Sequence, residues 1–148
     1  MDITDLIAPD CVIVDLKAAS KTHLLTELAR RAAAAIGLPQ KEIGDALEAR
    51  ESLGSTGVGA GIAIPHAKLG ALGHFFGLFV RLDRPIAYDA IDSQPVDLVF
   101  LLLIPGNTRE HLTALATISR RLRDAEITKN LRASKNADDA YATLTRKL

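Results

Sequence analysis

The spacing of hydrophobic residues predicts two amphipathic helices in the first third of the chain. Apolar residues recur every three or four positions between Ser20, which suits a helix start, and Gly37, which suits a helix end. A second such pattern has Pro39 in its first turn and ends at Gly54, which places Arg50 in the last turn. The expected apolar faces are Leu24, Leu25, Leu28, Ala32 and Ile36 in the first helix, and Ile43, Ala46 and Leu47 in the second.

Three apolar runs predict strands at 12–16, 75–80 and 96–104. The third run is nearly all apolar, which is typical of a central strand that is covered on both faces. The stretch 81–94 is expected to be a connection with at most a short strand near Ile86.

A glycine-rich turn joins the second helix to a further short strand at 62–64. Pro65 stops this strand, so His66 is expected at its exposed end. The glycines allow close approaches that side chains would forbid, so the turn can surround an anion or a partner. They are Gly54, Gly57, Gly59 and Gly61.

The last third of the chain is expected to be helical. Asn107 or Thr108 suits the start of a helix that carries His111 in its first turn, and 124–132 and the residues after Asn136 suit two more. A protonated histidine would face the positive end of the helix dipole, so the position of His111 favours a neutral imidazole.

The irregular alternation of these helices and strands predicts an α/β sandwich, with a central mixed β-sheet flanked by helices on both faces. A chain of 148 residues fits one domain, 1–148, because a globule of this size buries about 68–70% of its unfolded surface.

Charge and hydropathy narrow the classes of function. Eighteen basic residues balance eighteen acidic ones and no basic patch is interleaved with aromatics, so nucleic acid is not an expected partner. The run 96–105 is too short to span a bilayer, and the residues after Met1 lack the basic start of a signal peptide. A cytoplasmic protein without direct membrane insertion is expected, and the single Cys11 indicates no disulfide.

Nucleotide-binding loops fit the glycine-rich turn poorly. A P-loop needs a Lys after its last glycine and a helix behind it, and neither is present. A dinucleotide fingerprint would start at Gly59 and Gly61, but Ile64 occupies the third glycine position and a strand follows.

Metal binding and hydrolysis are also poorly supported. The histidines lack the short spacings of metal ligands, and Ser55 and Thr56 near His66 have no evident acidic residue to complete a triad. Histidine itself then remains as the nucleophile: a neutral imidazole attacks a phosphoryl group, and a guanidinium such as that of Arg50 neutralises its oxygens.

The stretch Arg50-Glu-x-x-Gly-Ser-Thr-Gly-Val-Gly-x-Gly-Ile-Ala-Ile-Pro-His66 resembles the signature of the fructose/mannitol-type IIA domains of the bacterial phosphoenolpyruvate-dependent phosphotransferase system. Ile104-Pro-Gly-Asn-Thr-Arg-Glu-His111-Leu-Thr-Ala-Leu-Ala resembles the family segment around a second histidine. The resemblance runs from about Ile3 to Leu144. It implies that His66 carries the phosphoryl group on Nε2, that Arg50 stabilises it and that His111 lies beside it. The loop residues Ser55, Thr56, Gly57 and Gly59 are then expected around the phosphate.

Within that family, Ala90-Ile-Asp-Ser-Gln-Pro-Val-Asp97 and Glu110-His111-Leu are most similar to the nitrogen-regulatory IIA proteins, although Ser93 stands where these typically have Gly. The similarity implies a phosphocarrier that acts as a regulator, with an HPr-like phosphocarrier (NPr) and regulatory target proteins as partners. Transfer between histidines is mostly positioning and charge stabilisation, so no metal or organic cofactor is expected.

Two other functions stay open at this point. One is a sugar-specific IIA component that passes phosphate to a IIB cysteine, and the other is a binding module that is not phosphorylated. In each case a partner needs an apolar docking face, for which the candidates are Leu53, Val58, Leu69, Leu72 and Phe75.

Overall fold

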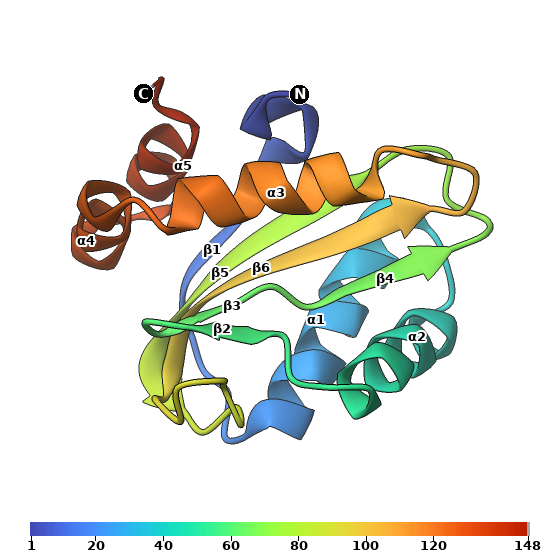
Figure 1. Cartoon of the computed structure of the whole chain (residues 1–148), viewed down its shortest axis with the longest axis horizontal. Helices are drawn as coiled ribbons and strands as arrows, with labels where there is room; N and C mark the ends of the chain where they lie inside the picture. Colours follow the sequence, from blue (N-terminus) through green and yellow to red (C-terminus); the bar gives the residue numbers. More distant parts are fainter. Residues whose placement is uncertain (148) are drawn as a thin grey trace.

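The computed structural model describes residues 1–147 and has a six-stranded mixed sheet (Figure 1). The sheet order is β1-β5-β6-β3-β2, and β4 also pairs with β6. β5 runs parallel to β1 and antiparallel to β6, which confirms the mixed sheet. The strands are β1 (Ile7–Leu16), β2 (Gly57–Gly59), β3 (Ile62–Ala63), β4 (His66–Leu69), β5 (Phe76–Ile86) and β6 (Val96–Pro105).

Helices cover both faces of the sheet, as predicted (Figure 1). β6 is the centre of both cores: Val99, Leu101 and Leu103 pack with the first helix pair, and Phe100 and Leu102 with the C-terminal helices. One face carries α1 (Lys21–Ile36) and α2 (Gln40–Ser52), and the other carries α3 (His111–Leu122), α4 (Ala125–Ala133), α5 (Ala137–Thr145) and the 3-10 turn Ile3–Asp5.

Side chains cap the starts of three of the five α-helices in residues 1–147, namely α1, α4 and α5. Ser20 caps α1 by accepting the N–H of His23, and Gly37 ends it with a φ of 72°. Asp124 and Asn136 cap α4 and α5 through their side chains. The predicted start of α3 was wrong, because Thr108 uses its hydroxyl to accept the N–H of Glu110, 3.1 Å away, in the turn before the helix.

Two strands are longer than their apolar runs. β5 continues past Val80 to Ile86, so the first part of the expected connection, 81–86, is strand. Arg81 interrupts the apolar pattern but is only 8% exposed, because its guanidinium donates to the carbonyls of Leu131 and Ser134. β1 starts at Ile7 and tolerates Pro9 because it pairs with β5 alone, at the edge of the sheet.

His66 opens a strand and does not end one, which corrects the prediction for the stretch around Pro65. β3 and β4 follow one another along β6, with Ile62 opposite Leu98 and His66 opposite Leu102. Pro65 donates no hydrogen bond, but its carbonyl accepts the N–H of Leu102 at 3.0 Å, so pairing continues past it. β2 was not predicted, because a run of glycines carries no side-chain alternation.

Candidate functional site

His66 is the first residue of β4, a four-residue strand that pairs with β6. Its half-buried ring is held from one side by the backbone, because Nδ1 lies 2.9 Å from the carbonyl oxygen of Ile64. A carbonyl oxygen only accepts hydrogen bonds, so Nδ1 carries the proton. The neutral ring therefore has its lone pair on Nε2.

Arg50 reaches that lone pair from the last turn of α2. Its Nε–H donates to Nε2 of His66 at 3.3 Å, and its Nη1 donates to the carbonyl oxygen of Gly54 at 2.8 Å. The guanidinium thus bridges the end of the helix, the start of the glycine-rich turn and the histidine. The structure brings Arg50 and His66 together across sixteen positions of sequence.

His111 approaches from the opposite core as the first residue of α3. It lines the same depression as Arg50 and His66, which has a volume of about 520 Å³. Its Nδ1 is buried and is the only such side-chain atom in residues 1–147 without a hydrogen-bond partner. A polar atom in that state has bonding capacity that a bound group can use.

The surroundings lower the pKa of His66. Burial is the largest cause, and the positive charge of Arg50 and the nearby His111 act in the same direction. The hydrogen bond to Ile64 and the charge of Glu51 oppose the effect but do not cancel it. The imidazole is therefore neutral at pH 7, as a nucleophile requires.

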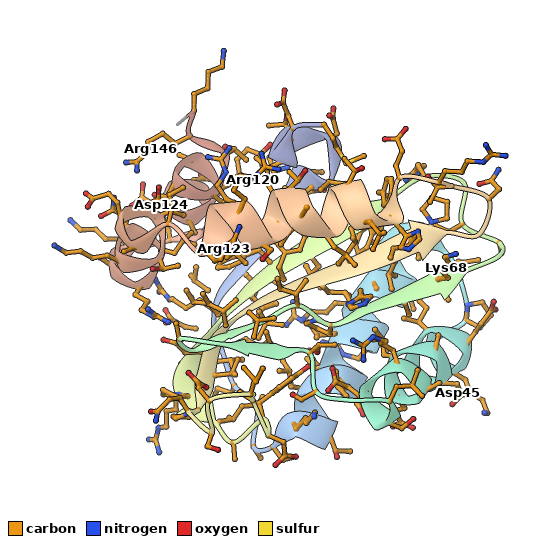
Figure 2. The ribbon with its side chains drawn as sticks, in the orientation of Figure 1. Asp45, Lys68, Arg120, Arg123, Asp124 and Arg146 are labelled. Carbon is orange, nitrogen blue, oxygen red and sulfur yellow. The ribbon has the colours of Figure 1, made fainter. Side chains whose placement is uncertain are left out.

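The depression has an apolar rim. Leu53 is 83% exposed and Leu112 is 69% exposed, one on each side of the histidines. Of the other docking candidates, Leu69 and Leu72 belong to the core, and Val58 is exposed but lines a separate pocket. Lys68 also lines the depression, two residues after His66, and Figure 2 shows it on β4.

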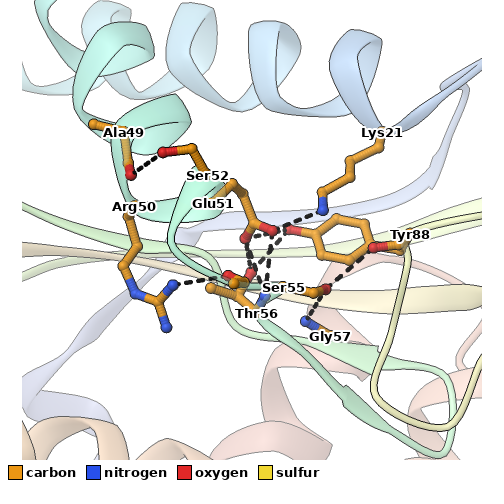
Figure 3. Close-up of polar contacts among 10 residues, drawn as sticks. Lys21, Ala49, Arg50, Glu51, Ser52, Ser55, Thr56, Gly57 and Tyr88 are labelled. Atoms are coloured by element: carbon orange, nitrogen blue, oxygen red, sulfur yellow. Dashed lines mark hydrogen bonds and ion pairs between the residues drawn. The ribbon is translucent and has the colours of Figure 1, made fainter.

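The predicted loop residues do not line this depression. Ser55 donates its hydroxyl to the carbonyl of Tyr88 and accepts the N–H of Gly57 (Figure 3). Thr56 directs its N–H and hydroxyl to Glu51. Gly57 packs so closely on Ala90 that a Cβ there would lie 2.8 Å from the alanine side chain. Gly59 lies beside Asp92. The hydroxyls of Ser55 and Thr56 and the N–H groups of Thr56 and Gly57 are thus bonded within the protein.

Sequence reasoning missed the partners of that loop, Glu51, Tyr88 and Lys21. Glu51 accepts from Thr56, from the Tyr88 hydroxyl at 3.2 Å and from Lys21 at 2.8 Å. Its place directly after Arg50 was the available signal. Nothing in the sequence indicated that Tyr88 and Lys21 fold onto it.

Two general findings apply to residues 1–147. No helix there is long and apolar enough to cross a membrane. No group of three or more His, Cys, Asp or Glu side chains in the same stretch is arranged to hold a metal ion.

Comparison with known sequences decides the family. The sequence model described as phosphoenolpyruvate-dependent sugar phosphotransferase system, EIIA 2, matches residues 5–147. The chain belongs to this EIIA type 2 family. Proteins of the EIIA type 2 family act in phosphoryl transfer. The two segments that carried the resemblance, around His66 and His111, lie within the match.

Among EIIA type 2 relatives, the nitrogen regulatory protein of Bradyrhizobium diazoefficiens is 52% identical over 97% of this chain and 95% of its own. The crystal structure of the nitrogen regulatory protein IIA-Ntr of Neisseria meningitidis has a TM-score of 0.91, with 33% identity over 97% of this chain and 99% of that one. The fructose-specific EIIABC component of Bacillus subtilis is 32% identical over 93% of this chain, which corresponds to 22% of that protein. The chain is thus more similar to the nitrogen regulatory proteins than to that sugar component.

Proposed function

We propose that this EIIA type 2 protein is a nitrogen-type regulatory phosphocarrier that accepts a phosphoryl group on Nε2 of His66. The donor is a phosphohistidine protein of the HPr type (NPr). One observation carries the proposal: the Nδ1–H bond to Ile64 leaves the lone pair on Nε2, beside the guanidinium of Arg50.

The transfer exchanges one phosphorus–nitrogen bond for another. Nε2 of His66 forms a bond to phosphorus, while the bond to the donor histidine breaks and its electron pair stays on the donor nitrogen. The proton on Nδ1 of His66 stays in place, because the Ile64 carbonyl holds it. No other group of the protein has to gain or lose a proton.

Arg50 changes partner in this step. Its Nε–H cannot bond to an Nε2 that has become bonded to phosphorus, so the guanidinium turns to the phosphoryl oxygens, for which its planar array of donors is suited. His111 has a free nitrogen to bond the same group from α3. Arg50 neutralises charge on the transferring group and His111 helps to position that group, and charge stabilisation with positioning is the main requirement of phosphoryl transfer.

Docking of the donor uses the apolar rim, in which Leu53 and Leu112 flank the nucleophile. The phosphoryl group places about 1.5 to 2 negative charges between these leucines. The ring offsets one of them, because it is cationic once Nε2 is bonded to phosphorus and Nδ1 keeps its proton. A regulatory target that prefers the neutral rim is repelled by the phosphorylated one. This supports regulation without a large conformational change.

The test is phosphorylation with phosphoenolpyruvate, enzyme I and the HPr-like carrier, read as acid-labile phosphate by intact mass. The wild type is expected to gain one phosphoryl group and His66→Ala none. His74→Ala is the matched control, because His74 also bonds a backbone carbonyl through Nδ1 but is exposed and outside the depression. Label on His66→Ala would contradict the site, and an unlabelled wild type would favour a binding module.

A sugar-specific role is the second candidate, because the fructose-specific relative shares 32% identity. In that case the phosphoryl group would pass from His66 to a IIB cysteine. Adding a fructose- or mannitol-type IIB protein to the labelled chain distinguishes the two roles. A regulator keeps its label over the time in which a sugar IIA domain loses it.

A further inference from the structure

Glu51 follows Arg50 in the sequence, but the two side chains point to different sides of α2 (Figure 3). The side chain of Glu51 is only 6% exposed. It lies at the end of a helix, where the dipole disfavours a negative charge, and burial disfavours it further. A buried charge in this position is stable only if hydrogen bonds and an ion pair replace its contacts with water.

Three parts of the chain donate to this carboxylate. Thr56 contributes its N–H, 3.2 Å from both oxygens, and its hydroxyl. Tyr88 contributes its hydroxyl at 3.2 Å, and Lys21 its ammonium at 2.8 Å. Burial raises the pKa of Glu51, but the bonds from Lys21 and Thr56 outweigh it and the net pKa lies below the usual value. Glu51 is therefore charged at pH 7.

The bonds between Glu51 and Thr56 close a short loop that begins directly after Arg50 and contains Gly54. Gly54 lies between Glu51 and Thr56, and its carbonyl accepts Nη1 of Arg50 at 2.8 Å. Thr56 also accepts the N–H of Ile64 at 3.0 Å through its own carbonyl. The carbonyl of Ile64 in turn accepts Nδ1–H of His66. One residue, Thr56, thus connects Glu51 to the supports of both functional side chains.

We propose that Glu51 is a positioning residue that, by clamping Thr56, sets both the guanidinium of Arg50 and the tautomer of His66. The inference rests on the proposed role of His66 as the phosphoryl acceptor. The clamp fixes Gly54 on one side and Ile64 on the other. Without it, Arg50 loses a fixed acceptor and the imidazole loses a fixed carbonyl.

The test compares Glu51→Gln with two controls in the full chain. The glutamine keeps the size, but its NH₂ group faces the donors of Thr56 or Lys21, so the clamp loses an acceptor. Lys21→Met removes the ion pair and keeps the clamp. Glu48→Gln changes an exposed glutamate one turn earlier on α2.

The first readout is the rate of His66 phosphorylation against the concentration of phosphorylated HPr-like donor. For Glu51→Gln the saturating rate is expected to fall about 10- to 100-fold, as for a small misplacement of reacting groups. The donor concentration for half the rate should not change, because Leu53 and Leu112 are untouched. Lys21→Met should lower stability but keep the saturating rate, and Glu48→Gln should alter neither. Rates that fall in proportion to lost stability in Glu51→Gln and Lys21→Met alike would overturn the inference.

The second readout is the ¹⁵N NMR spectrum of the His66 imidazole in the unphosphorylated protein. Wild type and Lys21→Met should show the single tautomer with the proton on Nδ1, and Glu51→Gln a mixture of tautomers. An unchanged tautomer in folded Glu51→Gln would contradict the inference. Because this spectrum needs no donor, it stays informative if the wild type takes no label, which would be a failure of the proposed function instead.

Discussion

Two sets of polar side chains meet at the end of α2, and they are bonded in opposite ways. In the depression, the Arg50–His66 bond is 3.3 Å long and Nδ1 of His111 has no partner among the described residues. On the other side of the helix, the buried side chain of Glu51 is bonded by three residues, Thr56, Tyr88 and Lys21. Under the proposed function, the first set changes partners when a phosphoryl group arrives, and the second set holds the first in place during that change.

The largest expected effect comes from Arg50 in the loosely bonded set. Arg50→Ala should slow phosphoryl transfer about 10²–10³-fold, as the loss of one charged donor to a transition state does. The free energy of unfolding should change by only about 1 kcal/mol, because the arginine otherwise complements a helix end and bonds one exposed carbonyl, that of Gly54. Rapid-quench kinetics and urea unfolding measure the two quantities. An unfolded variant would show that the arginine is structural.

Tyr88 in the tightly bonded set should give the opposite pair of results. Tyr88→Phe removes the hydroxyl that bonds Glu51 and Thr56, and we expect the free energy of unfolding to fall by about 1–2 kcal/mol. The transfer rate should stay near that of the wild type, because the Glu51–Thr56 clamp remains. If Tyr88→Phe lowered the transfer rate strongly and left the free energy of unfolding unchanged, Tyr88 would act in transfer and not in stability, which would contradict this account.

Removing a charge from one set or from the other should shift the pKa of His66 in opposite directions. Arg50→Ala should raise this pKa, because it removes a cation, and Glu51→Gln should lower it further, because it removes an anion. NMR titration of the imidazole measures both shifts. Shifts in the same direction would contradict the placement of the Arg50 and Glu51 charges beside His66.

The same pKa fixes the pH dependence of the wild type. The nucleophile is the neutral imidazole, so transfer should persist as the pH falls below about 6.5, the usual value for histidine, and decline near the lowered pKa. The folded state binds this proton less readily than the unfolded chain. The contribution of His66 to stability is therefore complete above about pH 6.5 and is lost as the pH falls through the lowered pKa.

The smallest expected effect lies in the turn beyond both sets. Ser93 has a φ of 59°, a left-handed conformation that glycine adopts without strain. Ser93→Gly should stabilise the fold by about 0.5 kcal/mol, since relief of strain is partly offset by the flexibility of glycine in the unfolded chain. Ser93→Ala is the control and should not stabilise. Urea unfolding distinguishes them, and the transfer rate should be unchanged in both.

The elements that the sequence predicted are those with a strong period or a local cap. The apolar stripe of α1, its Ser20 and Gly37 ends and the doubly buried β6 all follow from neighbours in the chain. Two of the errors came where a distant partner decides. Arg81 extends β5 because carbonyls at the end of α4 receive it, and Pro65 does not end the pairing because β6 continues beside it.

The functional site was likewise predicted only in part. Arg50, His66 and His111 were identified from the sequence, and all three line one depression. The glycine-rich turn was expected around the phosphate, yet Thr56 and Gly57 bond to Glu51 and Ser55. Which way a backbone N–H points in such a turn depends on contacts with Tyr88 and Ala90, more than thirty residues away, and no local pattern encodes them.

The central claim is that the Ile64 carbonyl holds the proton on Nδ1 and leaves Nε2 as the nucleophile. A ¹H–¹⁵N correlation spectrum of the His66 ring, recorded before and after phosphorylation by the HPr-like donor, tests it most directly. We predict a protonated Nδ1 in both states and phosphorus coupling at Nε2 in the second. Phosphorus coupling at Nδ1, or a proton on Nε2 of the free protein, would contradict the account.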